Sequence, residues 1–133
     1  MAYVGILYVG SEQQELPLVF DTGSVWSWLP AQTCSQCLDQ GMAAYDPDQS
    51  LFYRRVSDHV QVVKYGQGLV YGYDSKDRIC LASSLKNETV SAHDCLDDFA
   101  FLAALSLSGL PEMKSGVAGL APNGQRGSNK LFI

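Results

Sequence analysis

The residues best placed to do chemistry form the run Asp21-Thr22-Gly23-Ser24, which follows the apolar stretch at residues 16–20. An ionisable side chain at the end of a buried strand is costly unless hydrogen bonds satisfy it. Gly23 allows a tight turn that points backbone N–H groups at the carboxylate, and the Thr22 hydroxyl can anchor that turn. Ser24 can donate to the outer carboxylate oxygen. The simplest interpretation is a turn with a capping aspartate, and the alternative is a carboxylate held for acid–base catalysis.

Two aromatic residues could complete such a site. Trp28 lies seven residues after Asp21, and Tyr65 directly precedes Gly66-Gln67-Gly68, a turn between two apolar runs. Apolar runs on either side of a glycine-containing turn predict a β-hairpin. Taken alone, Trp28 and Tyr65 would be interpreted as ordinary aromatic core residues.

The elements that must position these residues are predominantly β-strands. Short runs of aromatic and β-branched residues, separated by glycine and proline turns, are typical of strands. We expect strands at residues 3–9, 16–20, 26–29, 60–65, 69–73, 78–81, 99–105 and 117–120. Helical signals are weak: Ser128 could cap a helix beginning at Asn129, but the chain stops at Ile133. The sequence therefore predicts an all-β fold with very little helix and an ending at Ile133 that resembles a cut.

The bulk composition favours one folded domain. The chain has 133 residues, of which 47% are hydrophobic and only 17% charged, so a disordered chain is not expected. A net charge of −5 without a run of lysines or arginines argues against nucleic acid or anionic lipid as a partner. The longest apolar run, at residues 99–105, is too short to span a bilayer. Nothing at the start has the pattern of a signal peptide, so any targeting segment is expected upstream.

Four cysteines allow three interpretations. A structural zinc site usually has two close pairs of ligands, whereas Cys80 and Cys95 are fifteen positions apart. A thioredoxin-like site at Cys34 and Cys37 would need a strand-to-helix context that the surrounding residues do not suggest. Two disulfides, Cys34–Cys37 and Cys80–Cys95, fit best and imply an oxidising compartment. The glycosylation sequon at Asn87 agrees with that compartment.

Several of these motifs together resemble the pepsin-like aspartic protease family. The run from Asp21 to Pro30 resembles the first active-site motif of that family, which also has an aromatic residue seven positions past the aspartate. Tyr3-Val4-Gly5 resembles its opening strand, residues 63–68 resemble its flap, and residues 116–122 resemble the segment that closes its lobe. Cys34 and Cys37 lie where the family has a small disulfide loop. The resemblance covers nearly the whole chain, in order and at the family's spacing.

The resemblance implies a fold and a mechanism. Residues 1–133 would form the amino-terminal lobe, a distorted closed β-barrel with a flap hairpin, and the carboxy-terminal lobe would be absent. In the family each lobe contributes one aspartate, and the two activate a water that attacks the peptide bond. Asp21 would be the first of the two, and the chain alone would be inactive. The family needs neither a metal nor another cofactor.

The resemblance also assigns a role to the flap. The Tyr65 hydroxyl would lie within reach of the Trp28 indole N–H, at the base of the flap. The backbone of Gly66, Gln67 and Gly68 would pair with an extended peptide or protein substrate. Gln67 departs from the family, which usually has serine or threonine at this position, so the preference for substrate side chains is left open.

Two other functions remain as alternatives at this point. One is a homodimer of single lobes that builds the catalytic pair from two copies of Asp21. The other is a non-catalytic pepsin-like module that binds peptides or proteins. For the aspartic protease, the resemblance further implies a secreted zymogen, and the disulfides and the sequon favour the secretory pathway, with an extracellular or lysosome- or vacuole-like destination.

Overall fold

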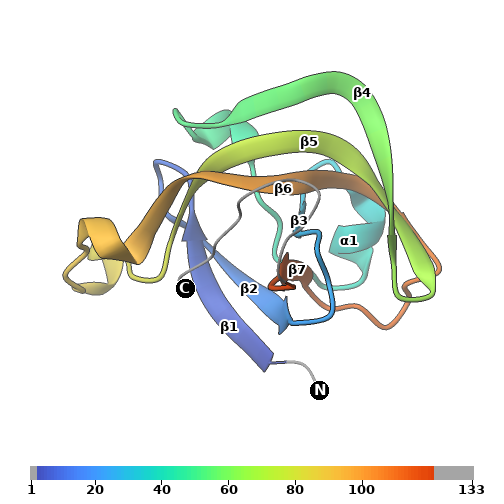
Figure 1. Cartoon of the computed structure of the whole chain (residues 1–133), viewed down its shortest axis with the longest axis horizontal. Coiled ribbons are helices and arrows are strands. Elements are labelled where there is room, and N and C mark those ends of the chain that lie inside the picture. The colour runs from blue at the N-terminus through green and yellow to red at the C-terminus, as the bar shows by residue number, and fades with distance from the viewer. Residues whose placement is uncertain (1–2, 122–133) are drawn as a thin grey trace.

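Seven strands make up most of the computed structural model, which describes residues 3–121 (Figure 1). The strands are β1 (Tyr3–Val9), β2 (Gln14–Asp21), β3 (Trp28–Pro30), β4 (Arg54–Tyr65), β5 (Gly68–Cys80), β6 (Cys95–Ser108) and β7 (Gly116–Gly119). Within these residues the helical elements are α1 (Ser35–Asp39) and three short 3-10 helices at Pro47–Gln49, Ser84–Lys86 and Ala92–Asp94. The all-β prediction is confirmed. The helix expected from Asn129 lies outside the described residues.

The sheet closes into a ring. Its strand order is β1-β2-β7-β3-β6-β5-β4, and β1 also pairs with β5 through Tyr8↔Cys80 and Val9↔Ile79. All strands except β4 therefore belong to the ring, while β4 is an outer strand paired with β5. Figure 1 shows β4, β5 and β6 as long curved strands that pass over β1, β2, β3 and β7. This ring is the closed β-barrel that the resemblance implied.

Polar residues in β5 made its sequence resemble two shorter strands. Strands were expected at residues 69–73 and 78–81, but the structure has one continuous strand because β4 and β6 pair with β5 on its two sides. Two polar side chains between the two runs, those of Ser75 and Asp77, are buried and hydrogen-bonded. The Ser75 hydroxyl lies 2.9 Å from the Tyr53 hydroxyl.

The other buried polar residue of β5 is Asp77, whose side chain has no exposed surface. Its carboxylate accepts hydrogen bonds from the Ser50 hydroxyl at 3.0 Å, from the Arg78 backbone N–H at 2.7 Å, and from the Tyr45 hydroxyl. Burial, together with the Asp77 carboxylate, raises the pKa of Tyr45 well above its usual value, so this phenol stays protonated and acts as a donor. These bonds fasten the long loop at residues 31–53 to the centre of β5.

A short helix within that loop gives Cys34 and Cys37 a setting that the sequence did not suggest. Helix α1 follows β3, and Cys34 is its N-cap, with the sulfur accepting from the Cys37 N–H at 3.2 Å. The local order is therefore strand to helix, contrary to expectation. Both cysteines are nonetheless fully buried and joined to each other, so the predicted disulfide is confirmed. Buried, paired cysteines of this kind have a structural role.

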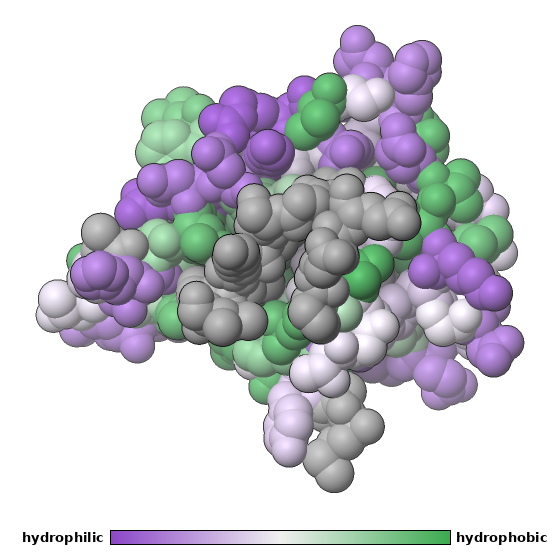
Figure 2. All heavy atoms as spheres, viewed as in Figure 1, coloured by the Kyte–Doolittle hydropathy of each residue, from purple (hydrophilic) through white to green (hydrophobic). Residues whose placement is uncertain are grey.

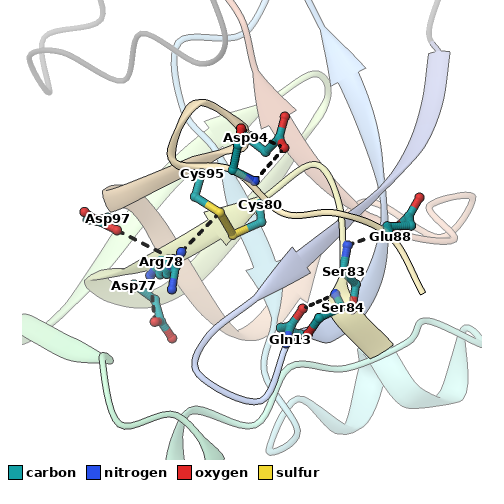
Figure 3. The surroundings of a disulfide bond; sticks show 11 residues. Gln13, Asp77, Arg78, Cys80, Ser83, Ser84, Glu88, Asp94, Cys95 and Asp97 are labelled. Carbon is teal, nitrogen blue, oxygen red and sulfur yellow. Dashed lines mark hydrogen bonds and ion pairs between the residues drawn. A yellow bond between two sulfur atoms is a disulfide. The ribbon is translucent and has the colours of Figure 1, made fainter. Parts of the chain in front are cut away.

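The second predicted disulfide, Cys80–Cys95, is also confirmed, and it links β5 to β6 directly across the ladder. It closes the excursion at residues 81–94, which carries two of the 3-10 helices. Figure 3 shows Arg78 between this disulfide and Asp97: its guanidinium lies 3.4 Å from the Cys95 sulfur and 3.6 Å from the Asp97 carboxylate.

The interior contains two apolar clusters. One lies inside the ring around Leu7, Leu18 and Phe101, and the other surrounds Trp28 and includes the Cys34–Cys37 disulfide. Outside, polar and apolar groups are interspersed over β4 and β5 (Figure 2). Among the described residues, no helix has the length and apolar character needed to cross a bilayer.

Candidate active site

Asp21 is the last residue of β2, and its backbone is fixed by a parallel strand from the far end of the chain. In the β2–β7 ladder Asp21 lies opposite Gly119, and the Asp21 carbonyl accepts from the Leu120 N–H at 2.9 Å. The turn that follows is held in the same way, because the Ser24 carbonyl accepts from the Ala121 N–H at 3.0 Å. A Cβ at Gly119 would overlap the Ser24 carbonyl, so the close approach requires glycine.

Three donors converge on the Asp21 carboxylate. The Gly23 N–H donates to Oδ1 at 2.9 Å, and the Ser24 hydroxyl donates to Oδ2 at 2.6 Å. The Tyr65 hydroxyl donates to the same Oδ2 at 3.0 Å, across 44 residues of sequence. The Thr22 side chain is exposed and makes no hydrogen bond within the described residues.

These donors favour the ionised carboxylate. The Ser24 hydrogen bond, with smaller contributions from Gly23 and Tyr65, lowers the pKa of Asp21 below its usual 3.8 against partial desolvation, which raises it. Hydrogen bonds to the charged form stabilise that form. Asp21 is therefore a half-buried carboxylate that stays negatively charged at mildly acidic pH.

Tyr65 occupies a different place from the one expected. The resemblance placed its hydroxyl within reach of the Trp28 indole N–H, but the hydroxyl donates to Asp21 and the buried Trp28 Nε1 has no hydrogen-bond partner within the described residues. The two rings instead meet edge to face, with centroids 6.3 Å apart. The indole N–H can only donate, so the hydroxyl would accept from Trp28, whereas here it donates to Asp21, and a hydrogen bond to a charged acceptor is a strong one. Burial, followed by the bond to Asp21, raises the pKa of Tyr65 to about 12.

The expected hairpin tip joins β4 to β5. Tyr65 and Gly68 are paired across the ladder, and Gly66 has a positive φ of 56° that suits glycine. Gly66 and Gln67 are exposed, whereas Gly68 is buried. The hairpin thus places an exposed backbone at its tip and the Tyr65 hydroxyl against Asp21.

The remaining predicted residues lie in other parts of the fold. Asn87 is exposed in the excursion closed by Cys80 and Cys95. Two residues that the sequence did not point to are Gln36 of α1 and Gln40 at its C-cap, whose side chains bind backbone groups at and after the end of β6. Their spacing of four positions on one helix face is the only sequence signal for this pair. No cluster of residues suited to hold a metal ion occurs within the described residues.

Comparison with known proteins identifies the family. Residues 2–121 match the model of the eukaryotic aspartyl protease family, and the chain belongs to that family. It is 31% identical to pregnancy-associated glycoprotein 2 of Bos taurus over 65% of its length, and 26% identical to embryonic pepsinogen of Gallus gallus over 93%. It is 32% identical to cathepsin E of Rattus norvegicus over 59% of its length. The matches cover 23%, 32% and 20% of these relatives, respectively, so the chain spans about a third of their length or less.

We expect Ser24→Ala to raise the pKa of Asp21, because the shortest of its three hydrogen bonds is lost. Because the wild-type pKa is lowered by folding, its contribution to stability is present above about pH 4 and is lost as the pH falls through the folded-state value. NMR titration of the Asp21 carboxyl carbon measures the change. Ser35→Ala, at an exposed serine of α1, serves as the control. An unchanged Asp21 pKa in Ser24→Ala would show that the hydrogen bond has no electrostatic role.

Proposed function

We propose that this chain is the amino-terminal lobe of an aspartic endopeptidase and that Asp21 is one of its two catalytic aspartates. The observation that carries the proposal is the Asp21 carboxylate itself, held by Gly23, Ser24 and Tyr65 in a chain of the aspartyl protease family. Thr22, Gly23 and Ser24 support the carboxylate by shaping the turn that follows it.

The chemistry requires a second carboxyl group. Two carboxyls that share one site do not both ionise, so one carries the proton and the other the charge. The charged carboxylate takes a proton from a water molecule, which attacks the peptide carbonyl, and the protonated partner hydrogen-bonds the developing oxyanion. We assign the second aspartate to a carboxy-terminal lobe outside these 133 residues. The short coverage of the relatives supports this assignment. The chain alone is then inactive.

The hairpin between β4 and β5 serves as the flap. Gly66 and Gln67 present exposed backbone at its tip, and an extended peptide can pair with such a backbone as an added strand. When substrate enters, the Tyr65 hydroxyl leaves Oδ2 of Asp21 to the catalytic water. Trp28 packs against the Tyr65 ring and supports the base of the flap.

The disulfides and the surface support a protein of the secretory pathway, with an extracellular or lysosome- or vacuole-like destination. Both disulfides need an oxidising compartment to form and persist. Asn87 and Thr89 of the sequon are both exposed and lie in a disulfide-closed excursion at a distance in sequence from the Asp21 turn. An N-linked glycan at Asn87 would therefore extend into solvent. A zymogen with an inhibitory propeptide is part of the same proposal.

In the complete protein, Asp21→Asn is expected to lower kcat/KM for an extended peptide by about a thousandfold or more, because the water loses its proton acceptor. Wild-type cleavage is expected to be fastest at acidic pH and between apolar residues. The measurement is peptide hydrolysis followed by chromatography, with circular dichroism to show an intact fold. Asp58→Asn makes the same chemical change at a side chain that is 96% exposed, and is expected to retain activity. Turnover retained by Asp21→Asn would refute the role of Asp21.

Expression through a eukaryotic secretory pathway is expected to give a protein whose electrophoretic mobility increases on treatment with peptide N-glycosidase. Asn87→Gln removes the acceptor nitrogen and should abolish the mobility change, whereas Thr89→Ser keeps the sequon and should preserve it. A wild-type protein with the same mobility before and after treatment would exclude the glycan.

A further inference from the structure

Helix α1 is tied to the end of β6 by two glutamine side chains. The Gln36 amide makes both hydrogen bonds of a paired strand residue: Nε2 donates to the Leu107 carbonyl at 2.8 Å, and Oε1 accepts from the Leu107 N–H at 3.0 Å. Gln40 Nε2 donates to two carbonyls, those of Leu110 at 2.9 Å and Met113 at 2.8 Å. We call residues 107–113 the 107–113 segment. The two glutamine side chains supply its backbone with hydrogen bonds that a neighbouring strand would otherwise supply.

This segment lies directly against the base of the flap. In the β5–β6 ladder Leu69 is opposite Ser108, and a Cβ at Gly68 would overlap both the Ser108 carbonyl and the Leu110 side chain. Figure 1 shows the β4–β5 turn beside the connection that follows β6, with α1 next to them. Because Gly68 leaves no space between the two backbones, a shift of the segment must also shift the flap base.

The flap base is in turn connected to Asp21. Gly68 pairs with Tyr65, and the Tyr65 hydroxyl donates to Asp21. Leu110 and Met113 also pack against the apolar cluster that contains Trp28 and contacts Tyr65. The 107–113 segment therefore contacts both the hairpin that covers Asp21 and the apolar side chains beside it.

Helix α1 is suited to act as an anchor. Its five residues include Cys37, which is joined to the N-cap Cys34 within the buried cluster around Trp28. Because this disulfide fixes the helix in the core, the two glutamines hold the 107–113 segment relative to a rigid element.

We propose that Gln36 and Gln40 are positioning residues, which set the distance between the flap and Asp21. That distance determines which sizes of apolar substrate side chain fit beside the flap. The inference deepens the proposed function and rests on it. The glutamines do not touch the reacting atoms. They act through the 107–113 segment and Gly68, and the relevant substrates are extended peptides with apolar side chains of different size.

The first test measures backbone hydrogen exchange in the complete protein carrying Gln40→Glu. A carboxylate cannot donate to the Leu110 and Met113 carbonyls, so amide exchange is expected to rise on the order of tenfold at 107–113 and at 65–69. Gln32→Glu adds the same charge to the same loop at an exposed side chain and is the matched control. If Gln40→Glu does not fold, Gln40→Met keeps the side-chain length without a donor.

The second test measures kcat/KM for two peptides that differ only in the size of one apolar residue at the cleaved bond. Gln40→Glu is expected to change the ratio of the two values by about threefold or more, because a small displacement of positioning elements alters the bound geometry. Gln32→Glu is expected to leave the ratio unchanged. Enzyme concentrations are set by titration with a tight-binding inhibitor, so that partial unfolding does not affect the ratio.

The outcomes separate the two proposals. Exchange that rises at 107–113 while residues 65–69 stay unchanged would overturn the inference, as would an equal rise throughout the protein or an unchanged peptide ratio. Turnover retained by Asp21→Asn would refute the proposed function. The hydrogen-exchange comparison does not depend on turnover and would still decide whether the glutamines hold the flap.

Discussion

Asp21 carries a negative charge at the end of a strand whose preceding residues face the core, and the rest of the structure satisfies that charge. The parallel β2–β7 pair fixes the aspartate backbone, the turn through Ser24 supplies two donors, and the β4–β5 hairpin supplies the third through Tyr65. Two donors are local to the turn, and the third comes from a strand 44 residues away in sequence. The backbone of Asp21 lies opposite Gly119 in the β2–β7 ladder, so the position of the carboxylate depends on residues more than 90 positions apart in sequence.

The same solution occurs at a second carboxylate, Asp77. Asp21 accepts from one serine hydroxyl, one tyrosine hydroxyl and one backbone N–H, and Asp77 accepts from the same three kinds of group. At Asp21 these neutral donors favour the charged form and lower its pKa without adding an opposing charge. At fully buried Asp77 these bonds fasten a loop to β5, whereas Asp21 is only half-buried and lies beside the β4–β5 hairpin. Burial distinguishes the structural carboxylate from the candidate catalytic one.

The local features were predictable because they depend on short stretches of sequence. The β-rich fold, the two disulfides and the turn after Asp21 all follow from residue type and spacing. The features that the sequence did not predict depend on long-range contacts. The length of β5 depends on partners for Asp77 that lie in another loop, and the bond from the Tyr65 hydroxyl to Asp21 depends on how the β4–β5 hairpin packs over the turn at 21–24. Gln36 and Gln40 bind backbone carbonyls, which have no sequence signature of their own.

We propose that Asp21 acts as one half of a carboxyl pair whose other half lies outside these 133 residues. The most direct measurement is NMR titration of the Asp21 carboxyl carbon, first in the 133-residue chain and then in the complete protein. In the chain alone, Asp21 should titrate in one step below its usual pKa, since its hydrogen-bond partners within residues 3–121 are Gly23, Ser24 and Tyr65 and do not include a second carboxyl. In the complete protein it should titrate together with a second carboxyl in two coupled steps. The same single step in both would contradict the account.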